Sequence, residues 1–109
     1  MANPVQVKGL TVTLNGDLST SANTSIAATV TDHGRSVTDL QPAHGALGHG
    51  VVIRPADLGY LHLHSNSQGS GPRLDFLGGV PDKGSYRVFV EFNRADKTYI
   101  AGYTVQVTQ

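Results

Sequence analysis

The chain has 109 residues, with eight Lys and Arg, eight Asp and Glu, and no cysteine. This length fits a single domain over residues 1–109, and the balanced charge gives no field that would attract nucleic acid or anionic lipid. Disulfides and thiolate metal sites are excluded, and we expect no membrane contact because no apolar run is long enough to span a bilayer.

Apolar and polar residues alternate with a period of two along most of the chain, and no segment has the spacing of an amphipathic helix. In the N-terminal half this alternation predicts strands at 5–7, 10–14, 26–30 and 36–37. The first two alternate out of phase around Gly9, which predicts a bulge or a strand that changes sheets. Residues 32–35 are expected to form a tight turn, and residues 38–46 to be irregular.

The next two strands form a hairpin that carries most of the histidines. Residues 48–54 and 59–64 alternate, and Pro55 and Asp57 are typical of a turn between them. If Arg54 pairs with Gly59, the expected opposed pairs are Ile53 with Tyr60, Val51 with His62, and His49 with His64. Three imidazoles would then share one face, and Gly48 and Gly50 would clear space around His49. A slip of one residue would send His49 to the other face.

The C-terminal half predicts a short strand at 73–77 and two long ones at 85–92 and 99–107. Tyr86 follows Gly84 and Ser85 at the start of the penultimate strand, which is typical of the tyrosine corner of immunoglobulin-like domains. Seven or eight short strands at this spacing predict an all-β fold, an immunoglobulin-like antiparallel β-sandwich.

Four segments carry a resemblance to a known group of proteins: 37–42 (VTDLQP), 45–49 (GALGH), 57–64 (DLGYLHLH) and 84–92 (GSYRVFVEF). They resemble bacterial extracytoplasmic immunoglobulin-like domains of the YtkA type, which occur in a copper or heavy-metal context. The resemblance implies a location outside the cytoplasm, secreted, periplasmic or membrane-anchored, and matches His49, His62 and His64. Ser65 departs from the pattern, in which proline follows the second histidine of the pair.

The chemistry of three neutral imidazoles with an open position suits Cu²⁺ or Zn²⁺. Cu⁺ would favour sulfur ligands, of which the chain offers only Met1, and a blue-copper site would need a cysteine. We therefore predict reversible binding of Cu²⁺ or Zn²⁺ by His49, His62 and His64. The fourth ligand would be His44, a carboxylate such as Asp57, or water.

Two other readings of the histidines stay open. They are structural in an interaction module that binds another protein through its sheet edges or loops, or they sense pH near their ordinary titration range. Enzymatic activity is not expected. The acidic residues are dispersed among turns, and Ser70, between two glycines, lacks the strand, turn and helix of a nucleophile elbow.

Overall fold

The computed structural model describes residues 3–21, 24–42, 45–56, 59–65 and 69–109. These residues form ten strands and no helix, as the alternation predicts. The strands are β1 (Asn3–Val7), β2 (Leu10–Asn15), β3 (Ser25–Asp32), β4 (Arg35–Ser36), β5 (Leu40–Gln41), β6 (Gly48–Arg54), β7 (Gly59–Ser65), β8 (Arg73–Leu77), β9 (Gly84–Arg94) and β10 (Lys97–Val107).

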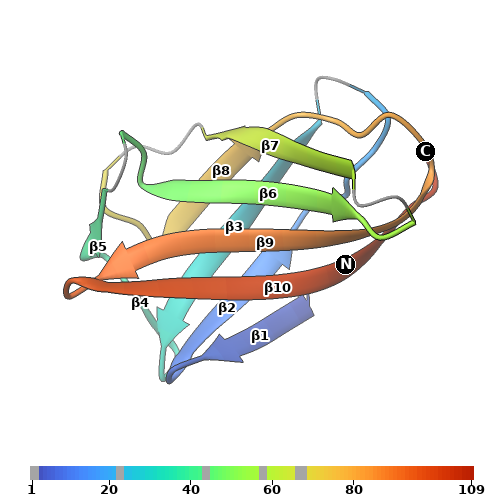
Figure 1. Cartoon of the computed structure of the whole chain (residues 1–109). Helices are drawn as coiled ribbons and strands as arrows, with labels where there is room; N and C mark the ends of the chain where they lie inside the picture. The colour runs from blue at the N-terminus through green and yellow to red at the C-terminus, as the bar shows by residue number, and fades with distance from the viewer. Residues whose placement is uncertain (1–2, 22–23, 43–44, 57–58, 66–68) are drawn as a thin grey trace.

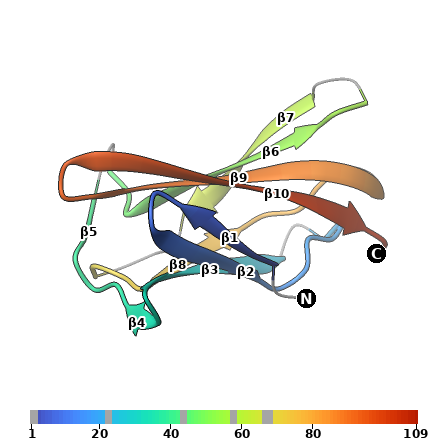
Figure 2. The same cartoon turned by 90° about the horizontal axis from the view of Figure 1, so that it is seen from below.

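The strands lie in two antiparallel layers that pack face to face (Figures 1 and 2). The hydrogen-bonded order is β1-β2-β3-β8-β7-β6-β9-β10, with β4 beside β3 and β5 beside β9. The first layer holds β1, β2, β3 and β8, and the second holds β7, β6, β9 and β10. Strand β7 links them, because its last two residues pair with β8.

This order is that of an immunoglobulin-like sandwich. Strands β2, β3 and β8 stand where such domains have strands A, B and E, and β7, β6, β9 and β10 stand for C′, C, F and G. The predicted fold class is therefore confirmed. Eight strands follow the main path, and the two additional ones, β4 and β5, are two residues long.

The core lies between the layers and is built from the inward positions of each strand. In β9, Tyr86, Val88, Val90 and Phe92 are at most 1% exposed, which confirms the face predicted for this strand. The Phe92 ring stacks on Tyr99 of β10 with centroids 5.3 Å apart. Tyr103 of β10 donates a hydrogen bond from its hydroxyl to the Val12 carbonyl of β2, at 2.7 Å, and so ties one layer to the other.

The tyrosine corner is present at the start of β9. The Tyr86 hydroxyl donates to the main-chain carbonyl of Asp82, at 2.7 Å, four residues upstream. β9 occupies the position of strand F, where immunoglobulin-like domains carry this feature. This bond holds the loop between β8 and β9 against the second layer, next to the β6–β7 hairpin.

Two expectations for the N-terminal half were wrong. The break at Gly9 is not a bulge: β1 and β2 form a hairpin in which Val7 pairs with Leu10. Lys8 and Gly9 have φ of 49° and 88°, as a two-residue type I′ turn requires. Residues 38–46, expected to be irregular, include β5, whose Leu40 and Gln41 pair with the end of β9.

Candidate functional site

The β6–β7 hairpin has the register that the sequence predicts over most of its length. Arg54 pairs with Gly59, Ile53 with Tyr60, and Val51 with His62. The ladder ends at Gly50 and Leu63, one residue short of the expected pair of His49 with His64. At that point β7 changes layers, and His64 pairs with Leu77 of β8. His49 pairs on its other side with Glu91 of β9.

The three histidines belong to the outer face of the sandwich. Leu63 and Val52 are buried, so the alternation of side chains along each strand turns His62 and His64, and likewise His49, away from the core. His62 and His64 are exposed and His49 is half-buried. His44 and Asp57, the expected fourth ligands, lie outside the described residues.

Gly48 and Gly50 have a different role from the one expected. Both are buried and face the core rather than His49. A Cβ at Gly48 would lie 3.1 Å from Leu74, and one at Gly50 would lie 3.1 Å from Phe76. The glycines therefore let β6 approach β8 across the core, and the space around His49 does not depend on them.

The outer face does not hold a preassembled metal centre in the described part of the chain. No three His, Asp or Glu side chains there converge closely enough to hold one ion. Glu91 is the carboxylate directly opposite His49 in the register, so it shares the outer face with that imidazole. The face thus offers nitrogen and oxygen donors that lie near one another along the strands but do not surround a common metal position.

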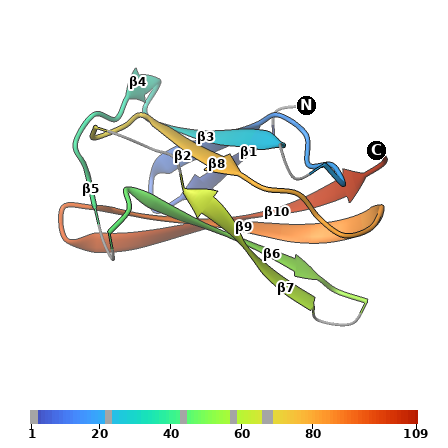
Figure 3. The ribbon, with the colours of Figure 1, turned by 90° about the horizontal axis from the view of Figure 1, so that it is seen from above.

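The inner face of the same hairpin borders a cavity that the sequence pattern does not predict. Where β6 ends and β7 begins, the hairpin diverges from the first layer (Figures 2 and 3). A cavity of about 220 Å³ opens there, lined by Val52, Arg54, Gly59, Leu61, Pro81 and Tyr86. The Arg54 guanidinium lies 2.8 Å from the Asp82 carboxylate at the rim.

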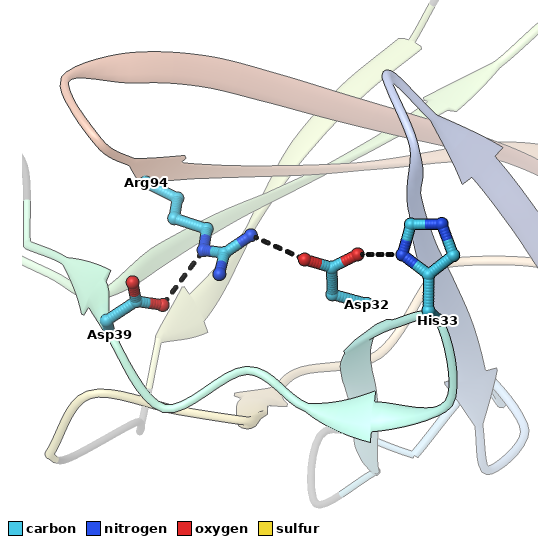
Figure 4. A network of polar contacts seen from close by, with 4 residues as sticks. All are labelled: Asp32, His33, Asp39 and Arg94. Atoms are coloured by element: carbon cyan, nitrogen blue, oxygen red, sulfur yellow. Dashed lines mark hydrogen bonds and ion pairs between the residues drawn. The ribbon is translucent and has the colours of Figure 1, made fainter.

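A cluster of charged side chains lies at the C-terminal end of β9, opposite to the end that carries Tyr86 (Figure 4). Arg94 donates to Asp39 at 2.9 Å and to Asp32 at 3.2 Å, and the His33 ring nitrogen lies 2.7 Å from Asp32. The hydrogen bonds from His33 and then from Arg94 hold the pKa of Asp32 below its ordinary value. The bonds to Asp39 and Asp32 raise the pKa of Arg94. This cluster fastens the β3–β4 turn and the segment before β5 to the second layer.

Sequence reasoning missed Arg54, Leu61 and Arg94. Arg54 and Leu61 are inward positions of strands that the alternation places correctly, so parity alone shows that a charge and a leucine face the interior side. The alternation does not show that the first layer leaves these two inward side chains uncovered. Arg94 pairs with residues 55 and 62 positions away, and no local pattern signals such a contact.

The fold and these surfaces define a small all-β domain of the immunoglobulin-like sandwich class. A model of a domain of unknown function, DUF8832, matches residues 5–109, and the chain belongs to this family. It is also similar to the crystal structure of a DUF4426 family protein from Pseudomonas aeruginosa PAO1, with a TM-score of 0.70 and 9% identity. That match covers 96% of this chain and 93% of the other.

At this identity, the structural match shows the fold alone. No curated protein sequence matches the chain significantly. Among the described residues, no helix has the length and apolar character needed to cross a membrane. The resemblance to YtkA-type modules stays a prediction.

Proposed function

We propose that this chain is a non-catalytic, extracytoplasmic binding domain that takes up Cu²⁺ or Zn²⁺ reversibly on the outer face of the β6–β7 hairpin. The ligands are His49, His62 and His64. The observation that supports this is the hairpin register, in which Val51 opposes His62, together with the alternation of side chains that turns His49 and His64 away from the core as well. The resemblance of the same segment to YtkA-type modules supports the choice of metal and of location.

Because the donors among the described residues do not surround a common metal position, the imidazole rings must rotate to bind the ion. His62 and His64 are exposed, so this rotation displaces water rather than core side chains. Side chains two residues apart on a strand lie about 7 Å apart at the backbone, within reach of a shared ion. Such a site binds less tightly than a preorganised one because ordering the rings costs conformational entropy.

The test is a titration of the chelator-treated domain with Cu²⁺ or Zn²⁺, followed by calorimetry and by thermal unfolding. A ligand that binds only the folded state at 100 times its Kd stabilises that state by about 2.7 kcal/mol, which raises the Tm of a domain this size by roughly 10 °C or more. His62→Ala and His64→Ala should abolish the rise. His33→Ala is the matched control, since this 91% exposed histidine belongs to the other cluster.

A second candidate function is docking of a protein partner, with structural histidines. Ile100 of β10 favours it, because this side chain is 53% exposed on the outer face, where it pairs in register with Glu91. β10 is also the last strand in the hydrogen-bonded order, and an edge strand can pair with a strand of a partner. If neither ion raises the Tm, or if the histidine variants respond like the wild type, metal uptake is rejected and docking of a protein partner becomes the favoured function.

A further inference from the structure

The inner face of the β6–β7 hairpin presents an apolar groove with one cation at its end. Its lining includes Val52, Leu61, Pro81 and the buried ring of Tyr86. Leu61 and Pro81 also line a neighbouring hollow of about 330 Å³ that continues along the loop between β8 and β9. Leu61 is 36% exposed, so this groove leaves a large leucine side chain in contact with water.

The groove is separate from the histidine face. Val52 pairs with Leu61, and Arg54 pairs with Gly59, so these inward positions alternate with the outward His62 along the hairpin. An occupant of the groove would therefore contact one side of the hairpin while the histidines remain on the other. The inference below does not rest on metal uptake.

The charge at the end of the groove specifies what fits it. The Arg54 side chain is 29% exposed and lines the cavity, whereas its partner Asp82 is 70% exposed on the loop before β9. Ion pairs this exposed contribute about 0–1 kcal/mol, so a competing carboxylate displaces Asp82 at small cost. Asp82 then returns to water, while the guanidinium keeps an oxygen partner.

We propose that the groove binds an amphipathic carboxylate, a short aliphatic chain with a terminal COO⁻. The chain lies against Leu61 and Pro81, and the carboxylate binds the Arg54 guanidinium in place of Asp82. Burial of the apolar chain supplies most of the affinity, and Arg54 supplies the preference for an anion.

The probe is octanoate, compared with 1-octanol and with octyltrimethylammonium, each followed by amide chemical shifts of the whole domain. We expect a Kd for octanoate of roughly millimolar size and a three- to tenfold weaker Kd for 1-octanol, with the cation weakest. The shifts should centre on Gly59 and Leu61 of the cavity and on Gly79, which lines the neighbouring hollow. Equal affinities for the acid and the alcohol, or shifts centred elsewhere, would overturn the proposal.

Variants separate the two parts of the groove. Arg54→Met should remove the preference for the acid over the alcohol, and Leu61→Gln should weaken both ligands. Leu77→Gln is the matched control, because Leu77 is 38% exposed and does not line the groove. It should leave both affinities unchanged.

Asp82→Asn tests the displacement step directly, because it removes the carboxylate that competes with octanoate for the Arg54 guanidinium. We expect octanoate to bind about two- to fivefold more tightly to this variant, with no change for 1-octanol. A merely structural ion pair would give no gain. Unchanged or weaker binding of octanoate to Asp82→Asn would contradict the displacement step, even if the other variants lost affinity.

Discussion

Gly50 of β6 has no side chain at a place where the core is already full. An added Cβ would lie 3.1 Å from Phe76 and 3.2 Å from Leu63, both of which are buried. Close-packed side chains yield only by moving their own neighbours. We therefore expect Gly50→Ala to lower the free energy of unfolding by about 1–3 kcal/mol, measured by urea denaturation.

Gly102 of β10 is the control for this substitution, since it also lies within a strand. A Cβ there would meet the end of the Arg87 side chain at 2.7 Å and the Phe89 ring at 3.0 Å, both on the outer face. The Arg87 guanidinium can swing into water, so Gly102→Ala should cost less than Gly50→Ala. Equal losses would show that the outer face is packed as tightly as the core.

Asp32 links the stability of the fold to low pH. Its pKa is lower in the folded chain than in the unfolded one, first through His33 and then through Arg94. A group with a depressed folded-state pKa adds stability above its unfolded pKa of about 3.8 and loses it as the pH falls through the folded value. We expect stability to decline below about pH 4, and Asp32→Asn to weaken that decline.

The measurement is the urea midpoint of both proteins at about pH 3, 4 and 7. Asp75→Asn serves for comparison because Asp75 forms an ion pair with Arg73 of the same strand and is not part of the Asp32 cluster. If Asp75→Asn flattens the acid response as much as Asp32→Asn does, the cluster in Figure 4 has no special part in it.

At the scale of elements, the hairpins show what a sequence can and cannot specify. The β6–β7 register was predictable because alternation runs through both strands and Pro55 and Asp57 indicate the turn. The same reasoning misread the phase change at Gly9. In a two-residue hairpin loop the residues flanking the turn pair directly, as Val7 does with Leu10, so the alternation shifts phase. That shift indicates a tight turn as well as a bulge.

The same distinction applies to the candidate sites. Strand parity and the turn register together predicted one face for His49, His62 and His64, and the burial of Val52 and Leu63 makes it the outer face. The cavity beside Arg54 could not be predicted, because it arises where two layers diverge and its wall includes Pro81, far along the chain. The change of layer by β7 at His64, which ends the ladder before His49, likewise depends on pairing with β8.

The tyrosine corner gives a test at this scale. Tyr86 is 1% exposed, and its hydroxyl holds the β8–β9 loop through the Asp82 carbonyl. Tyr86→Phe removes that bond and keeps the ring, so we expect a loss of about 0.5–1.5 kcal/mol, or a Tm several degrees lower in a calorimetric scan. Asp82→Asn keeps the acceptor, which belongs to the main chain, and should change the Tm much less. Similar Tm values for the wild type and Tyr86→Phe would exclude a contribution from the corner.

For the whole molecule, the question is what keeps two layers of strands in register with each other. Apolar packing between the layers is not directional, whereas hydrogen bonds between residues about ninety positions apart are. The Thr20 amide donates to the Gln109 carbonyl at 2.8 Å. The Lys8 ammonium donates to the Thr98 carbonyl at 3.2 Å near the surface. The Tyr103 hydroxyl donates to the Val12 carbonyl within the core. These contacts connect the ends of the chain and fix how the first hairpin lies across the last.

Tyr103 makes this connection sensitive to high pH. Burial raises the pKa of its phenol from 10 to about 12, because the phenolate would lose its hydration in the core. The unfolded chain therefore releases this proton first. The stability due to Tyr103 is fully present below pH 10 and is lost as the pH rises toward 12.

We expect the urea midpoint of the wild type to fall between about pH 9.5 and 11.5 more steeply than that of Tyr103→Phe. The variant should start from a lower midpoint at neutral pH, because it lacks the bond to Val12 that joins β10 to β2. The two proteins differ only at this phenol, so the difference between the two curves isolates its contribution. Parallel curves would mean that Tyr103 ionises without cost, and that the bond between the layers is not what resists alkaline unfolding.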